Sequence, residues 1–419
     1  MSDHCESHPS RRAVLGTAGA LFAWGAVPRT AYAAPGSRDA RLVVVVLRGA
    51  LDGLSAVAPL GDPAYADLRP GIALTRDGNG DGRAAALPLD GFFALHPALP
   101  TFARLYGARQ ALVVHAAATG YRERSHFDGQ DVLESGQPGP GHTASGWLNR
   151  LVAALPAGEG IPPRTALGVG VVPPLILRGP APVLGWAPPR LPRASDELGR
   201  RVLGLYEARD PMLAEALARG LDVDALTKGG PREAGGKEAG GKEAGGKEAG
   251  GLRGLAEGAA RLIAADDGPR IAALALDGWD THANEGGATG RLAGLLGGLD
   301  GVFSAFAEIL APRWSDTAIL VVTEFGRTAR VNGTTGTDHG TGTVAFLLGG
   351  AVRGGRVLAD WPGLAPAQLH EGRDLAPTTD LRAVAKGLAA DLFGLSPAVL
   401  ASRVFPGSEG VRPVRGLVV

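Results

Sequence analysis

Four stretches of the chain are apolar at nearly every position, and the first of them is rich in β-branched residues. They lie at residues 42–47, 111–115, 271–276 and 318–322. Runs without alternating polar positions are typical of strands whose two faces are both covered, as in parallel sheets. Between the last two runs, residues 291–310 carry leucine and phenylalanine at helical spacing. This alternation predicts an α/β fold that is doubly wound, with a mainly parallel central sheet and helices on both faces.

A group of polar residues follows each of these apolar runs. The residues in these groups that could carry chemistry are Asp52, Ser125, His126, Asp280, His282 and Glu324. Open parallel sheets bind ligands outside the carboxyl ends of their strands. We therefore expect these side chains to meet at one edge of the sheet, joined by Asp338 and His339 from a later loop rich in glycine and threonine.

The number of carboxylates expected at this edge points to a metal. Carboxylates brought together repel each other unless they are protonated or neutralised by cations. The single cysteine, Cys5, precedes the mature chain predicted below, so the ligands must be His, Asp and Glu. Such a set favours Zn or Mn over Ca or Mg. The sequence thus predicts one or two divalent ions with ligands from Asp52, Asp280, His282, Glu324, Asp338 and His339.

Ordinary structural roles compete with this interpretation. Asp280 could cap a following helix, and Glu324 could form a salt bridge with Arg327. His96 and His115 are interpreted as packing or turn residues rather than ligands.

The first 33 residues have the parts of an export signal in the right order. Arg11 and Arg12 stand directly before an apolar stretch, residues 13–27, which is too short for a permanent membrane helix. Ala31 and Ala33 supply the small residues of a cleavage site, so the mature protein is expected to start near Ala34. The arginine pair predicts the twin-arginine route. We therefore expect a periplasmic or secreted protein whose partner during export is the twin-arginine translocase; the alternative is an amphipathic helix with a chance arginine pair.

Composition excludes some classes of partner. Lys+Arg and Asp+Glu are equal at 42 each, so no net charge attracts nucleic acid or an acidic membrane. No later segment looks long and apolar enough to be a membrane helix, so the mature form is expected to have none. A Lys-Glu-Ala-Gly-Gly repeat lies within residues 231–251. Its paired glycines and lack of an apolar face predict a flexible loop that interrupts a single domain of residues 34–419.

Eight short motifs resemble those of the DUF1501 family, exported bacterial proteins placed in the alkaline phosphatase-like superfamily with sulfatases and phosphomutases. The resemblance runs from about Arg41 to Val419, apart from the repeat. In order, the motifs are LRGALDG at 47–53, LHPAL at 95–99, SHFD at 125–128, GWLNR at 146–150, GWDTH at 278–282, TEFGR at 323–327, TDHG at 337–340 and GGAVRGG at 349–355.

The resemblance implies an alkaline phosphatase-like fold with two metals near the strand ends and a serine or threonine nucleophile. It places Asp52 and Ser125 at one metal, and Asp280 with His282 at the other. Either Glu324 replaces the superfamily's post-strand aspartate, with the pair at 338–339 completing the site, or that pair is itself the superfamily's Asp-His. The chain departs from the superfamily pattern, because Phe325 rather than His follows Glu324. The one-residue gap between Asp280 and His282, where the superfamily has three, is a second departure.

These implications favour a metal-dependent hydrolase or transferase that acts on a small or polymeric phosphate or sulfate ester outside the cytoplasm. Ser125 would attack phosphorus or sulfur. Arginines near the strand ends would hold the anion, namely Arg48, Arg122, Arg124 and Arg327. Two alternatives remain: a hydrolase that uses metal-activated water and needs no serine, and a non-catalytic exported binding protein that keeps the fold and a structural metal.

Overall fold

The computed structural model describes residues 39–78, 84–141, 144–156, 166–188, 196–227 and 244–419. Apart from Pro156, these residues belong to one compact unit, formed by residues 38–155 and 162–419. The export signal expected at residues 1–33 lies outside the described residues, as do residues 231–243 of the repeat.

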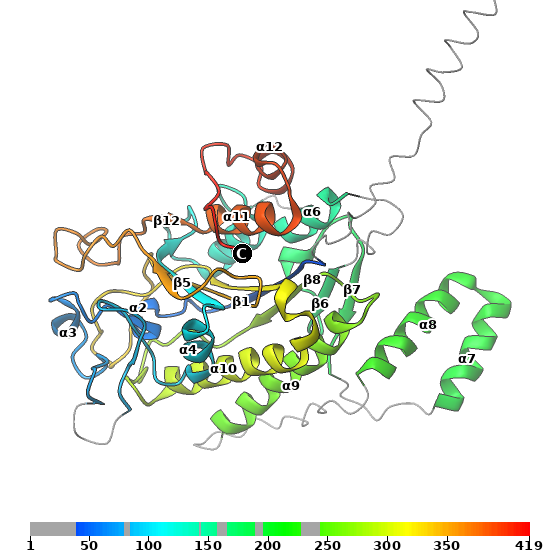
Figure 1. Cartoon of the computed structure of the whole chain (residues 1–419), viewed down its shortest axis with the longest axis horizontal. Helices are drawn as coiled ribbons and strands as arrows, with labels where there is room; N and C mark the ends of the chain where they lie inside the picture. The colour runs from blue at the N-terminus through cyan, green and yellow to red at the C-terminus, as the bar shows by residue number, and fades with distance from the viewer. Residues whose placement is uncertain (1–38, 79–83, 142–143, 157–165, 189–195, 228–243) are drawn as a thin grey trace, which may run out of the picture. The chain divides into compact units, whose positions relative to one another are not determined.

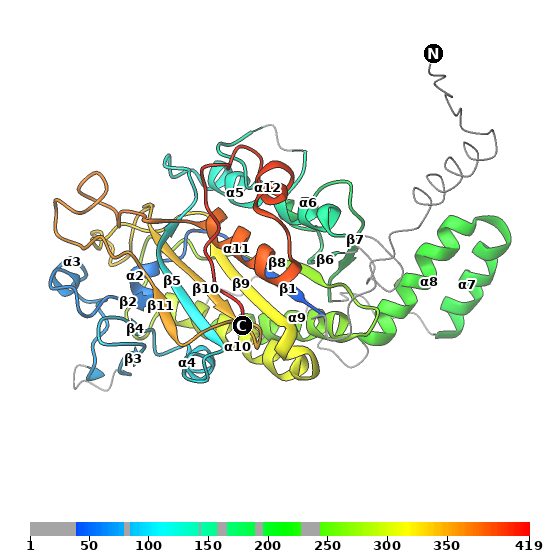
Figure 2. The same ribbon diagram turned by 45° about the horizontal axis from the view of Figure 1, so that its top comes forward.

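A large sheet forms the centre of this unit (Figure 1, Figure 2). Its strand order is β11–β5–β10–β9–β1–β8–β6–β7, with β12 beside β5. The strands are β1 (Arg41–Leu47), β5 (Ala111–Ala118), β6 (Ala166–Val169), β7 (Val183–Trp186), β8 (Ile271–Leu276), β9 (Thr317–Thr323), β10 (Thr343–Leu348), β11 (Arg356–Leu358) and β12 (Thr379–Asp380). Strand β10 runs antiparallel to β5 and β9, whereas the other pairs are parallel. The prediction of a mainly parallel sheet is confirmed.

Strand β1 shows why its sequence lacks alternation. It lies between β8 and β9, with Val45 opposite Leu274 on one side and Val321 on the other. All of its residues are buried. Val43 and Val45 pack into the core on one face of the sheet, whereas Val44 packs into the core on the other. Both faces of the strand are therefore covered by apolar side chains.

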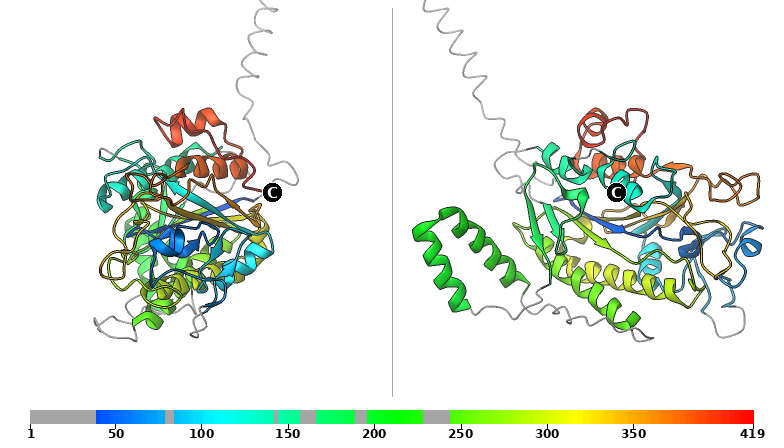
Figure 3. Two further views of the ribbon diagram at one scale, coloured as in Figure 1. Left: turned by 90° about the vertical axis from the view of Figure 1, so that its left-hand side faces the viewer. Right: turned by 180° about the vertical axis from the view of Figure 1, so that it is seen from behind.

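Helices supply the outer side of both cores (Figure 3). One face is covered by α4 (Pro100–Gly107), α9 (Ala244–Ala264) and α10 (Arg291–Ile309). The other is covered by α6 (Trp147–Ala154) and α11 (Leu381–Phe393). The doubly wound α/β arrangement is therefore confirmed as well.

Helix α10 is the helix expected at residues 291–310. By length and composition alone, it is apolar enough to cross a membrane, a property that we did not expect of any later segment. Leu296, Leu299 and Phe303 are nevertheless fully buried in the core, and the helix packs against α9. Its apolar composition is explained by packing on the sheet and on a neighbouring helix at once.

The end of the repeat is helical, contrary to the prediction of a loop through Gly251. Helix α9 begins at Ala244, so residues 244–251 belong to it. Leu252 and Leu255, just beyond the repeat, pack against the core. A helix fixed by such packing can extend into neighbouring Ala, Lys and Glu residues, although each glycine costs about 1 kcal/mol.

The remaining elements are short or lie between the main ones. A small sheet has the order β2–β4–β3, with β2 (Val57–Ala58), β3 (Leu87–Pro88) and β4 (Ala94–Leu95). The other α-helices are α2 (Gly53–Ala56), α3 (Tyr65–Leu68), α5 (His126–Ser135), α7 (Asp196–Arg209), α8 (Pro211–Leu226) and α12 (Pro397–Val399). Two 3-10 helices, η2 (Leu175–Leu177) and η3 (Ala311–Asp316), and a π-helix, η4 (Leu400–Val404), accompany them. Helix α2 follows β1 and α5 follows β5, so both begin at the carboxyl edge of the central sheet.

Candidate metal centre

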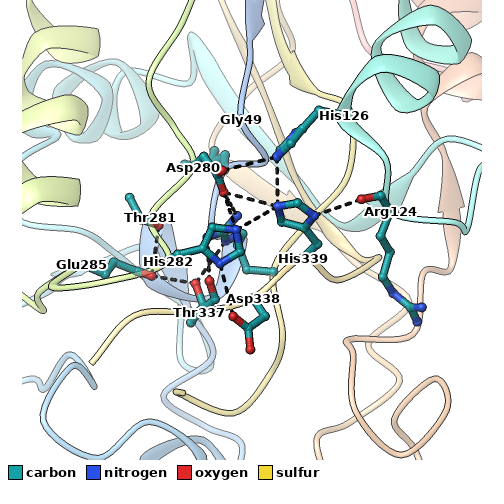
Figure 4. A network of polar contacts seen from close by, with 12 residues as sticks. Gly49, Arg124, His126, Asp280, Thr281, His282, Glu285, Thr337, Asp338 and His339 are labelled. Carbon is teal, nitrogen blue, oxygen red and sulfur yellow. Dashed lines mark hydrogen bonds and ion pairs between the residues drawn. The ribbon is translucent and has the colours of Figure 1, made fainter. Parts of the chain in front are cut away.

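Side chains that follow different strands meet at the carboxyl edge of the sheet. His126 begins α5 after β5, and Asp280 and His282 lie in the loop after β8. His339 lies in the loop between β9 and β10, where it forms a β-bridge with Arg327. In Figure 4, the three imidazole rings and the Asp280 carboxylate face one another.

The Nε2 atoms of the three histidines converge. His339 Nε2 lies 2.9 Å from His126 Nε2 and 3.0 Å from His282 Nε2. Asp280 Oδ1 is 3.1 Å from His282 Nε2 and 3.4 Å from His339 Nε2, and Asp280 Oδ2 is 3.6 Å from His126 Nε2. Ligand atoms of His126, Asp280 and His339 all lie within 4.8 Å of one another. Together with His282, these side chains form a candidate metal site, which is called the metal cluster below.

The Nδ1 atom of each of these histidines faces an oxygen. The pairs are His126 with Glu324 Oε1 at 2.8 Å, His339 with the Arg124 carbonyl at 2.9 Å and His282 with Asp338 Oδ1 at 3.2 Å. Ionised carboxylates and carbonyls can only accept, so the ring hydrogen must sit on Nδ1. When the rings are neutral, each Nε2 atom then carries a lone pair, and three such lone pairs point toward one place.

Facing lone pairs at these distances require a positive charge between them. His339 Nε2 takes part in two such contacts, and one proton would satisfy only one of them. A single divalent ion would satisfy both contacts and the nearby carboxylate together. Imidazole nitrogens with one carboxylate suit Zn or Mn, and metal-bound histidines usually donate their other N–H to a carboxylate or carbonyl. The donor set therefore fits a divalent ion.

Neighbouring charges keep the cluster from being fully protonated. The hydrogen bond with Glu324 raises the pKa of His126, whereas burial, and then the charge on His126, lower the pKa of His339. Burial alone would raise the pKa of Asp280, but its hydrogen bond with Arg327 and the positive charges around it together lower it. Asp280 is therefore ionised, and the opposite shifts of the two histidines oppose their simultaneous protonation.

Glu324 lies behind His126 rather than among the converging atoms, so its contacts give no support to its expected role as a ligand. The Gly49 N–H donates to Glu324 Oε1 at 2.8 Å, Gln130 donates to the same atom at 3.2 Å, and the Thr323 hydroxyl donates to Oε2 at 2.8 Å. Burial alone would raise the pKa of Glu324, but its hydrogen bonds, first that with His126, lower it. An ionised carboxylate with both oxygens engaged orients the imidazole.

Asp338 takes a similar place behind His282, not the expected place of a ligand. Its Oδ1 atom also accepts a hydrogen bond from Asn332 Nδ2 at 3.1 Å. That bond, and the one with His282, lower the pKa of Asp338. Its side chain is about half exposed, at 55 %, so this support faces solvent. The exposure distinguishes it from the fully buried Glu324.

Asp52 lies in a separate cluster and is not one of the converging side chains. Its Oδ1 atom caps α2 by accepting from the Ser55 N–H at 3.0 Å, and its Oδ2 atom forms a buried ion pair with Arg69. Burial alone would raise the pKa of Asp52, but the charge of Arg69 lowers it. An arginine that is 17 residues away in the chain neutralises this carboxylate, so its contacts give no support to the expected metal role.

The arginines expected to hold an anion are already paired, so the prediction of a free arginine clamp is not supported. Their ion pairs are Arg48 with Glu134 at 2.6 Å, Arg327 with Asp280 at 2.5 Å, and Arg124 with Glu371 at 2.5 Å and Asp374 at 2.9 Å. Arg122 donates to the carbonyls of Thr119 and Tyr121. Arg124 has a φ of 63°, a strained conformation for a residue with a side chain, and its carbonyl holds His339. Its place in the structure is that of a support for His339.

Ser125 precedes α5, one residue before His126, and its backbone N–H donates to the Tyr121 hydroxyl at 3.2 Å. Within the described part of the chain, its hydroxyl makes no hydrogen bond with the metal cluster. A serine nucleophile needs a base or a metal close enough to activate it. The hydrogen bonds at Ser125 therefore give no support to its expected role as the nucleophile.

Sequence reasoning gave His126 no metal role and did not identify Arg69 or Glu285. His126 could have been found, because it follows an apolar strand and begins a helix beside the expected site. Glu285 and Arg69 carry no such signal, since neither directly follows one of the four apolar runs. Their contacts depend on how the loops fold.

Comparisons with known proteins identify a family but no activity. The sequence model of the family described as "Protein of unknown function (DUF1501)" matches residues 110–404, well over half of the chain. No curated protein matches the sequence. A solved structure described as Ps i-CgsB in complex with k-i-k-neocarrahexaose is similar at a TM-score of 0.42 and 13 % identity, over 90 % of this chain and 75 % of that one. An alkaline phosphatase from the Antarctic bacterium TAB5 is similar at a TM-score of 0.33 and 10 % identity, over 75 % of this chain and 92 % of that one.

Proposed function

The chain belongs to the DUF1501 family, whose description records no function, and we propose that it is an exported, metal-dependent hydrolase of a phosphate or sulfate ester. One observation carries the proposal: three histidine Nε2 atoms and the Asp280 carboxylate converge, while each histidine Nδ1 faces an oxygen. His126, His282, His339 and Asp280 would hold the ion, with Zn or Mn favoured by the nitrogen donors.

The surrounding residues would prepare the metal cluster for an anionic substrate. Arg327 pairs with Asp280 at 2.5 Å, so three neutral imidazoles, this carboxylate and this arginine together carry no net charge. Glu324 holds the His126 ring at 2.8 Å and the Arg124 carbonyl holds His339 at 2.9 Å. A divalent ion in this place would polarise an ester oxygen and lower the pKa of a coordinated water.

Water is the nucleophile that we propose. The hydrogen bonds that Ser125 makes with the described residues do not include a member of the metal cluster, so these bonds give its hydroxyl no base. The proposed reaction breaks the bond between phosphorus or sulfur and the leaving oxygen, and water supplies the hydroxyl group that replaces it. The remaining proton of the water goes to the leaving oxygen, which departs as a hydroxyl group of the alcohol. This route leaves no covalent intermediate on the protein.

Metal analysis and turnover test this proposal. Protein purified from its native compartment should contain Zn or Mn and should hydrolyse members of a panel of phosphate and sulfate esters. His339→Ala should lose both the metal and turnover. His370→Ala is the matched control, because His370 pairs loosely with Glu371, at 3.9 Å, and is not a proposed ligand. Wild-type protein without metal would overturn the proposal, and metal without turnover would favour an exported binding protein instead.

We also propose that the protein is exported by the twin-arginine translocase. Support comes from the order of the arginine pair, the apolar stretch and the cleavage site in residues 1–33. Replacing Arg11 and Arg12 together by lysine should leave the precursor in the cytoplasm, as fractionation would show. Replacing Arg41 by lysine, a position within β1, provides a control outside the signal. Normal delivery of the double variant to the periplasm would contradict this route.

A further inference from the structure

Two loops carry three of the four proposed ligands, and Glu285 joins these loops. Glu285 Oε2 accepts hydrogen bonds from the Thr281 hydroxyl at 3.1 Å and from the Thr337 hydroxyl at 2.7 Å. All three residues are fully buried. Thr281 stands between Asp280 and His282 in the chain, and Thr337 stands two residues before the third ligand. Figure 4 shows this link beside the imidazoles.

A second set of hydrogen bonds connects Thr337 to Asp280 through Arg327. Arg327 Nε donates to the Thr337 hydroxyl at 3.2 Å, and Arg327 Nη2 donates to the Thr337 carbonyl at 2.6 Å. Arg327 Nη1 holds Asp280 Oδ1 at 2.5 Å. Because the Thr337 oxygen accepts from Arg327, its hydrogen is directed to Glu285. The acceptor at Glu285 therefore helps to orient the arginine that holds Asp280.

We propose that Glu285 is a positioning residue of the metal centre, which holds the loop of Asp280 and His282 against the loop of His339. This inference rests on the proposed function, because it concerns the same centre. Backbone contacts between the loops exist as well, such as Thr337 N–H to the Thr281 carbonyl at 3.2 Å. Glu285 adds a side-chain link between hydroxyls that would otherwise be buried without an acceptor.

The surroundings of Glu285 indicate that it acts in its neutral form. Its Oε1 atom accepts no hydrogen bond from the described residues, and it lies 3.8 Å from Arg69 Nη2. Burial, and then the charge of Asp52, raise the pKa of Glu285 to about 8. The raised pKa favours the protonated side chain over the charged one, although the Arg69 charge opposes this shift, and Oε2 accepts from both threonines in either form. Glutamine has the same shape and the same acceptor, so it should replace this glutamate well.

Metal affinity separates this role from a merely structural one. Zn affinity of the full chain would be measured by competition with a chelator. Glu285→Ala should weaken it about 10–100-fold, the range for residues that orient ligands. Glu285→Gln should stay within about threefold of wild type, because it restores the acceptor. Asp300→Ala is the matched control: this buried carboxylate accepts from the N–H groups of Thr101 at 3.0 Å and Phe102 at 3.1 Å at the start of α4. Its loss should lower stability without changing Zn affinity.

A second pair of variants keeps the test decisive if Glu285→Ala does not fold. Thr337→Val removes the hydroxyl at nearly constant volume and should weaken Zn binding, whereas Thr337→Ser should preserve it. Wild-type affinity in Glu285→Ala, or in Thr337→Val where the first variant does not fold, would overturn this inference alone. Wild-type protein that binds no Zn or Mn would overturn the proposed function and this inference with it.

Discussion

Five of the described histidines fall into two regions that satisfy their ring nitrogens differently. In the interior, His96 Nε2 lies 2.9 Å from the Gly287 carbonyl, and its Nδ1 accepts from the Ala98 N–H at 3.1 Å. His115 is bound in the same way, by the Val57 carbonyl at 2.9 Å and by its following N–H at 2.8 Å. Burial lowers the pKa of both, that of His115 to about 4. These two rings are neutral and fully bonded by the backbone.

At the sheet edge, the chain satisfies one nitrogen of each ring and turns the other toward its neighbours. Nδ1 faces a carboxylate or carbonyl, whereas Nε2 of His339 faces Nε2 of His126 and of His282. These rings are less buried than His96 and His115, with 24 % of the His126 side chain exposed. The difference teaches that burial does not mark a ligand histidine. A ligand histidine is marked instead by a ring nitrogen that the chain leaves to a partner from outside.

Removing one histidine ring from each region should give the largest difference in Zn affinity between two variants. His126→Ala should lower Zn affinity by more than about a hundredfold, since a lost ligand costs more than a lost support. His115→Ala should lower the free energy of unfolding by about 1–3 kcal/mol, because it leaves the Val57 carbonyl unpaired, with Zn affinity unchanged. Chelator competition and urea unfolding would measure the two effects. Equal loss of Zn in both variants would break the distinction.

Glu324 and Asp338 extend the comparison to the carboxylates that hold the ligand histidines in place. Glu324→Ala should weaken Zn binding about 10–100-fold, because His126 loses the acceptor that fixes its ring hydrogen on Nδ1. Asp338→Ala should have a smaller effect, because that carboxylate is 55 % exposed and water can replace it at His282. Titration of both variants with Zn would rank them. An equal or larger effect of Asp338→Ala would show that burial does not set the strength of support.

The pH dependence of stability should differ between the two kinds of buried group. Glu285 has its pKa raised from 4.5 to about 8, so its contribution is complete below pH 4.5 and is lost as pH rises toward 8. His115 has its pKa lowered from 6.5 to about 4, so its contribution is present above pH 6.5 and is lost as pH falls toward 4. The window from about pH 6.5 to 8 therefore isolates Glu285 from His115.

Urea unfolding of metal-free protein at the two ends of that window would test the sign. Wild type should be less stable at the upper end than at the lower end, and Glu285→Gln should reduce this difference because it cannot lose a proton. His126 titrates in both proteins, so its contribution cancels in the comparison. An identical slope in the two proteins would show that Glu285 keeps no proton in this range.

The sequence located the strands better than it assigned the roles of their polar neighbours. Apolar runs identified β1, β5, β8 and β9, because burial on both faces leaves a pattern in every residue. The pattern of apolar residues does not reveal that strand β10 runs antiparallel to its neighbours. Three of the six expected metal ligands converge, while Glu324, Asp338 and Asp52 have other partners. Strand ends place side chains within a few ångströms of a site, but which atoms meet depends on loops and on distant partners such as Arg69.

Ser125→Ala should have the smallest effect of the substitutions considered. The Ser125 hydroxyl lies beside the Tyr121 hydroxyl, and no member of the metal cluster forms a hydrogen bond with it. If water attacks the ester, turnover should stay within about threefold of wild type and Zn affinity should not change, because no lost group contributes more than one ordinary hydrogen bond. Steady-state hydrolysis of the best ester in the panel would measure the effect. A loss of several orders of magnitude with the metal retained would instead assign the first step to the serine, and the metal cluster would then serve to activate it.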